Sequence, residues 1–209
     1  MEILKKITFK RIETISIILF SISAILKGEI TVFYMLYLFW WQAVIHVLVN
    51  SIKTLTLNKY ATYRSELKEY FKGNFFLLFL YLFFIIIIYG LILNFNNNDL
   101  IILNFQVMFF KSWSFNLNLI VILISAVFFT KLDSDDVTSN IPVFSANNII
   151  LHISIILGAL MQFFIVLRFE SIFTEDNFWG SVLVISPFLI LRALLDGFND
   201  NPSQKVKDS

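Results

Sequence analysis

The stretch from Ile30 to Ile52, which reads ITVFYMLYLFWWQAVIHVLVNSI, is the feature that most restricts the fold of this chain. It is long enough to cross a bilayer, because the hydrocarbon core requires about 20 residues of apolar helix. It also carries Gln42, His46 and Asn50 at a spacing of four residues, which places them on one face of a helix. Polar side chains inside a membrane span are costly, so they usually face a partner, a cavity or a transport pathway.

The composition extends this argument to the whole chain. Of its 209 residues, 58% are hydrophobic and 15% are charged, whereas an ordinary soluble domain has about 25% charged residues. We therefore expect an all-α, polytopic membrane protein that forms a single integral-membrane domain over residues 1–209. The net charge of +1, with the basic residues in loops beside the spans, argues against nucleic-acid binding. The absence of cysteine excludes disulfides, thiolate metal sites and cysteine nucleophiles.

The hydrophobic pattern predicts a bundle of about six membrane-spanning helices. The segment near 100–111 is too short to cross a membrane and too apolar for a free loop. We expect it to form an interfacial or re-entrant helix on the outer side, or else to extend a neighbouring span. The C-terminal residues 199–209 are polar and are expected to be a disordered tail. The six predicted spans are roughly 8–26, 30–52, 75–93, 114–130, 149–167 and 178–198.

The orientation follows from the distribution of Lys and Arg. The N-terminus and the loop after the second span carry most of them, whereas the first, third and fifth loops carry about one each. Because basic residues gather on the cytoplasmic side, both termini are expected in the cytoplasm. Frequent Phe, Ile, Asn and Lys hint at a bacterial genome, hence the bacterial inner membrane. Trp40 and Trp41 lie near mid-depth, so we expect them to pack between helices.

The polar residues within the spans are the candidate site. On this topology, Gln42 lies near mid-membrane and His46 in the inner half. Lys53 extends the stripe of Gln42, His46 and Asn50. The later spans bring more polar groups toward the same side: His152, Arg192 and Asp196. Three readings remain open: hydrogen bonds between helices, a polar cavity for a substrate, ion or lipid headgroup, and axial haem ligation by His46 and His152. The chain lacks other haem signals, so we expect no cofactor.

The sequence offers little support for catalysis. It has no Gly-rich phosphate loop, no HExxH motif and no pair of intramembrane aspartates. We therefore expect a non-enzymatic scaffold or subunit whose partners are the lipid bilayer and another membrane protein or a second copy. A small transporter or channel with a cytoplasmic-side cavity is the alternative.

Two segments resemble an uncharacterised family of small prokaryotic multi-pass membrane proteins, which is known as a domain of unknown function. In the early segment, Leu38-Phe39-Trp40 resembles the family's Leu-Tyr-Trp run, and Gln42 stands where the family has a Glu. Asn50 and Lys53 match the inner end of that span. In the late segments, NIILHISIILGAL supplies His152 and Gly158, and ILRALLD supplies Arg192 and Asp196. The resemblance implies a multi-pass helical architecture and brings no known activity.

Overall fold

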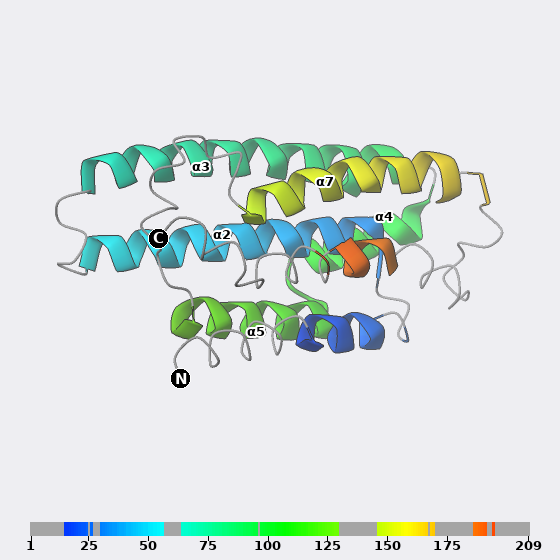
Figure 1. Cartoon of the computed structure of the whole chain (residues 1–209). Coiled ribbons are helices and arrows are strands. Elements are labelled where there is room, and N and C mark those ends of the chain that lie inside the picture. The colour runs from blue at the N-terminus through cyan, green and yellow to red at the C-terminus, as the bar shows by residue number, and fades with distance from the viewer. Residues whose placement is uncertain are drawn as a thin grey trace.

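The computed structural model describes residues 15–24, 26, 30–56, 64–95, 97–129, 146–166, 168–169, 186–191 and 194. In this part of the chain the structure is helical and contains no strands. Figure 1 shows long helices lying side by side as a bundle. The elements are α2 (Val32–Thr56), α3 (Arg64–Phe84), the π-helix η2 (Ile85–Leu91), the 3-10 turn η3 (Ile92–Asn94), α4 (Asn98–Met108), α5 (Trp113–Phe129), α7 (Ala146–Met161) and the π-helix η5 (Gln162–Val166).

Four helical segments are long and apolar enough to cross a membrane, judged by length and composition. They are Val32–Thr56, Lys68–Asn94, Asn98–Phe128 and Asn148–Ile165. The first, second and fourth of these correspond to the second, third and fifth predicted spans, whereas Asn98–Phe128 joins the fourth predicted span to the segment near 100–111. A shorter apolar helix, Ile15–Ala24, lies within the first predicted span. Most of the sixth predicted span, 178–198, lies outside the described residues, as does the predicted tail 199–209.

Helix α2 is the central helix of the bundle. Of its most apolar window, 83% is buried, whereas the other three candidate spans are 28 to 35% buried. It packs against α3, α5 and α7. A helix that is apolar on every side must be covered on every side, either by other helices or by lipid. Here the other helices cover α2 and themselves present apolar side chains outward.

The pairs of contacting residues give the helix directions. Trp40 of α2 reaches Leu78 of α3, while Phe33 lies beside Gly90 further along the third span. Increasing numbers on α2 therefore meet decreasing numbers on α3, and these helices are antiparallel. By the same argument α2 and α5 run in the same direction, because Tyr34 contacts Phe115 and Lys53 contacts Ala126. α7 runs in the same direction as α3, because Asn74 contacts Asn148 and Tyr89 contacts Ile155. These long helices therefore alternate in direction along the chain.

The third predicted span is not a regular α-helix to its C-terminal end. It changes to the π-helix at Ile85 and to the 3-10 turn at Ile92. The change brings Gly90 against the ring of Phe33, where an added Cβ would lie 3.2 Å from Phe33 Cε2. The Tyr89 hydroxyl donates to the carbonyl oxygen of Ile155 in α7. The run of isoleucines before Tyr89 gives no sequence signal for this change.

The predicted segment 100–111 is largely helical, because α4 covers Asn98–Met108. Asn97 caps this helix, and its side chain accepts from the backbone N–H of Leu100 at 3.1 Å. The helix ends at Met108. Phe110, two residues further on, has a φ of 57°, and the Asn116 side chain donates to its carbonyl oxygen at 2.7 Å. α4 packs against α2 and η2, so it is part of the bundle at the end where α2 begins (Figure 1).

Candidate functional site

The four polar residues of the predicted α2 stripe lie in the bundle interior to different extents. Gln42 is 2% exposed, whereas His46, Asn50 and Lys53 are half-buried. Gln42 and His46 each have an interaction partner within the chain. The stripe therefore faces other parts of the protein.

Lys53 spans the space between α2 and α5. Its Nζ donates to the carbonyl oxygen of Ala126 at 3.1 Å. Ala126 lies in the last turn of α5, which ends at Phe129. The last four carbonyl groups of a helix have no partner within it, and they form the negative end of the helix dipole. The Lys53 ammonium group thus caps α5 and places a positive charge where the dipole favours one.

Asn50 differs from its neighbours on the stripe. Its side-chain oxygen Oδ1 is buried and has no hydrogen-bond partner. Its main-chain carbonyl accepts from the Thr54 hydroxyl at 2.8 Å, a bond within α2. An unpaired buried oxygen is costly in an apolar interior. Among the residues of the stripe, Asn50 is therefore the one whose polar side chain is least explained by packing between helices.

His152 lies on the surface of α7 and pairs with α3. Its Nδ1 atom is 2.9 Å from the Tyr81 hydroxyl, and the two ring centroids are 5.9 Å apart. Tyr81 is buried at 7% exposure, whereas the His152 side chain is exposed. The partner of the Nδ1 atom is thus a tyrosine hydroxyl. Axial haem ligation by His46 and His152 remains an untested sequence hypothesis.

Arg192 and Asp196, the remaining predicted site residues, lie outside the described residues. Their expected position toward the same side of the membrane as His46 stays a prediction. Among the side chains that the structure does describe, no group of three or more His, Cys, Asp or Glu could hold a metal ion.

The structure shows a buried amide pair that the sequence interpretation missed. Asn148 Nδ2 donates to Asn74 Oδ1 at 2.7 Å, which joins α7 to α3. The Asn74 amide in turn donates to the Tyr70 carbonyl oxygen at 3.0 Å. Both asparagines are at most 1% exposed. The available signal was one Asn near the start of each of two apolar segments, which is also typical of a helix cap.

A second polar contact joins α2 to α5. Asn118 Nδ2 donates to the Tyr34 hydroxyl at 3.0 Å. Asn118 is fully buried, and its Oδ1 atom has no hydrogen-bond partner. The Tyr34 ring packs edge-on against Phe115 with centroids 5.3 Å apart. This contact combines ring packing with a hydrogen bond.

A third polar group lies where α2 begins and the π-helix ends. The Thr31 hydroxyl donates to Asn104 Oδ1 at 2.8 Å. The Asn104 amide lies 3.4 Å from the carbonyl oxygens of both Tyr89 and Gly90, and the Asn94 amide donates to the Tyr89 oxygen at 2.7 Å. Side-chain amides thus donate to main-chain carbonyls at the transition out of the π-helix.

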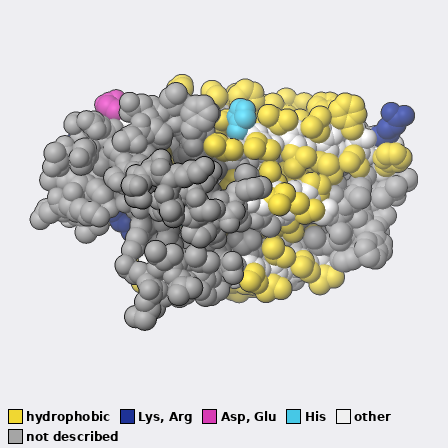
Figure 2. Space-filling model, viewed as in Figure 1, with side chains coloured by type: hydrophobic (Ala, Val, Ile, Leu, Met, Phe, Trp, Pro, Cys, Tyr) yellow, Lys and Arg dark blue, Asp and Glu magenta, His cyan; other side chains and the backbone are white. Residues whose placement is uncertain are grey.

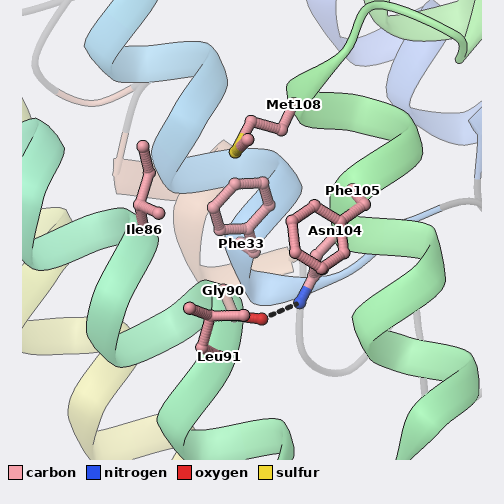
Figure 3. Close-up of a pocket in the computed structure, with 7 residues that line it drawn as sticks. All are labelled: Phe33, Ile86, Gly90, Leu91, Asn104, Phe105 and Met108. Carbon is pink, nitrogen blue, oxygen red and sulfur yellow. Dashed lines mark hydrogen bonds between the residues drawn. The ribbon is translucent and has the colours of Figure 1, made fainter.

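A small cavity adjoins this third group (Figure 3). Its accessible volume is about 10 Å³, close to the least that can hold one water molecule. The cavity is therefore too small for a substrate in this conformation. It is lined by Phe33, Ile86, Gly90, Leu91, Asn104, Phe105 and Met108.

No family model, no characterised protein and no solved structure matches this chain. The site is therefore interpreted from its own geometry.

Proposed function

We propose that the chain is a six-span protein of the bacterial cytoplasmic membrane, with both termini in the cytoplasm and α4 at the outer interface. The four apolar helices and their alternating directions support this topology. The distribution of charge adds support: in Figure 2 the visible acidic and basic side chains lie toward the two ends, and most of the side chains that are coloured between them are hydrophobic.

Reporter fusions test this topology. A reporter after Ser209 should be active on the cytoplasmic side, and one at Asn97 should be active on the outer side. An external Ser209 would overturn the orientation, whereas an internal Asn97 would overturn the order of the spans.

Within this membrane topology we propose a non-enzymatic role: a scaffold or subunit that binds another membrane protein or lipid. The proposal rests on the α2 stripe, whose polar side chains are engaged inside the bundle. Gln42 is buried, and Lys53 caps α5. Polar groups engaged in this way hold helices together. The outward faces of α3 and α5 carry large apolar side chains, including Phe76 and Phe128, which suit contact with lipid or with another membrane protein.

Purification of the full chain from its native membrane in a mild detergent tests this role. We expect a membrane protein or a lipid to remain bound in fixed stoichiometry through two successive chromatography steps. A chain that purifies alone and turns over a substrate would overturn the proposal.

The unpaired Asn50 oxygen favours a second candidate, a transporter or channel with a cavity on the cytoplasmic side. Because the chain has no cysteine, a single introduced cysteine reports the accessibility of one position. Under the scaffold proposal, Gln42→Cys and His46→Cys should resist a membrane-impermeant thiol reagent. Thr56→Cys, at the exposed end of α2, is the reactive control. Fast labelling of Gln42→Cys from the cytoplasmic side would favour the transporter.

A further inference from the structure

Among the exposed side chains that the structure describes on α7, the imidazole of His152 is the polar group. The α7 outer stripe, as we name it, lies along one side of α7 and its continuation η5. It consists of five exposed residues, of which the first two are adjacent and the others follow at spacings of three or four: His152, Ile153, Ile156, Leu160 and Phe163. In Figure 2 a histidine side chain is visible among hydrophobic ones on this view of the molecule. Acyl chains pack well against the apolar members of the stripe, but they have no group that can hydrogen-bond to the imidazole.

The Tyr81 contact defines what the imidazole presents outward. A phenol hydroxyl is a good hydrogen-bond donor, and a neutral imidazole has one acceptor nitrogen and one N–H. The Tyr81 hydroxyl and His152 Nδ1 are 2.9 Å apart, a distance that fits either direction of donation. We assign Tyr81 as the donor, because a phenol is the stronger acid of the two groups, and in this assignment the proton of the neutral ring lies on Nε2. The exposed side of His152 therefore offers an N–H donor, and its complement is a hydrogen-bond acceptor.

The position of the pair along the bundle limits where that acceptor comes from. Tyr81 lies six residues from the start of the third predicted span at 75, and His152 lies three residues from the start of the fifth at 149. At 1.5 Å per residue the pair lies roughly 5–9 Å inside the edge of a hydrocarbon core about 30 Å thick. Lipid headgroups carry their acceptors at the edge of this core. A helix that crosses the membrane can carry an acceptor at the depth of His152.

We propose that the α7 outer stripe binds a transmembrane helix of another membrane protein, and that an amide or carboxyl oxygen on this helix accepts a hydrogen bond from His152 Nε2. This inference rests on the proposed scaffold or subunit role and names the surface and the chemistry of the partner. A second copy of the chain fits less well, because a symmetric pair would place two N–H donors opposite each other.

Defined peptides in vesicles test the proposal without knowledge of the native partner. The full chain, labelled with a donor dye at Thr56→Cys, is reconstituted in phosphatidylcholine vesicles. Acceptor-labelled, Leu-based transmembrane peptides are added, one with a single Gln at the depth of His152 and one with Leu there. Because membrane hydrogen bonds are modest, we expect the Gln peptide to associate about threefold more tightly, or more, than the all-Leu peptide.

Two matched variants separate the hydrogen bond from packing. His152→Phe keeps a ring but removes both nitrogens. It should therefore reduce the association of the Gln peptide to that of the all-Leu peptide. His152→Gln keeps an N–H donor and should retain a preference for the Gln peptide. Each variant is first checked for the melting temperature of the parent chain. Equal association of the two peptides or an unchanged preference in His152→Phe would overturn the proposal. A mixture of donor-labelled and acceptor-labelled copies of the chain is measured in parallel, and energy transfer between copies that exceeds transfer to the Gln peptide would also overturn it.

The outcome is distinguishable from failure of the proposed function. A native complex that survives His152→Phe would leave the subunit role intact and remove this surface as its basis. A chain that purifies alone but still selects the Gln peptide would argue against the subunit role and leave this surface as a binding site.

Discussion

The indole N–H of Trp40 donates a hydrogen bond of 2.7 Å to the main-chain carbonyl oxygen of Leu78 and so joins α2 to α3 within the bundle. Trp40 is 8% exposed, and its ring stacks on that of Tyr37 with centroids 5.7 Å apart. This confirms the expectation that Trp40 packs between helices. Away from the membrane interfaces, a buried indole needs an acceptor for its N–H, and a helix carbonyl supplies it.

Replacement of Trp40 by Phe should destabilise the bundle by about 1–2 kcal/mol. The change removes one interhelical hydrogen bond, worth about 0.6 kcal/mol in membranes, and leaves a small cavity in the core. Unfolding in mixed detergent micelles, followed by circular dichroism, measures the loss. Trp113→Phe is the matched control, because Trp113 is 65% exposed. Equal effects at the two positions would contradict the assigned role of Trp40.

The buried Asn74–Asn148 pair should show coupling in a double-mutant cycle. Asn74→Leu or Asn148→Leu alone leaves the other amide without its partner, which costs about 1–3 kcal/mol. The double replacement removes both polar groups, so its cost should be smaller than the sum of the single costs. The free energy of unfolding of the four proteins gives the coupling. Additive single and double effects would mean that the 2.7 Å contact contributes nothing.

Lys53→Met should destabilise α5 by about 0.5–1 kcal/mol while retaining most of the apolar stem of the side chain. The expected loss is that of a charge at a helix C-terminus. Hydrogen exchange of the last turn of α5 should increase more than exchange of α3. Lys72→Met is the control, because Lys72 forms an exposed ion pair with Glu69, and such pairs contribute little. Unchanged exchange near Ala126 would refute the cap.

Substitutions of Gly158 should become more harmful as the added side chain grows. A Cβ at this position would lie 3.2 Å from side-chain atoms of Val32, Leu36 and Tyr89. Alanine requires those side chains to shift slightly, whereas valine should cost about 1–3 kcal/mol through overpacking. Thermal melting of the two variants measures the trend. Ile156→Val, at an exposed position on the same helix, should have little effect, and a melt of Gly158→Val like that of the parent would refute close packing here.

The sequence by itself predicted most of the helical framework. The segment from Ile30 to Ile52 had to be a helix because its length and apolar character leave few alternatives, and α2 covers almost all of it. Local hydrophobicity also predicted the third to fifth spans. These properties belong to single segments, so no knowledge of their neighbours is required.

The tertiary structure alone decided which polar groups meet. Lys53 and Ala126 are 73 residues apart in sequence, as are Thr31 and Asn104. Their contacts depend on how helices are rotated and staggered, which the pattern of one helix does not fix. The π-helix at Ile85–Leu91 also depends on neighbouring helices. Within it, Tyr89 contacts α7 and Gly90 contacts α2. The run of isoleucines in the sequence does not indicate this departure from a regular α-helix. Hydrophobicity along the chain thus determined where the helices lie in sequence, whereas packing between helices decided the partners of their few polar side chains.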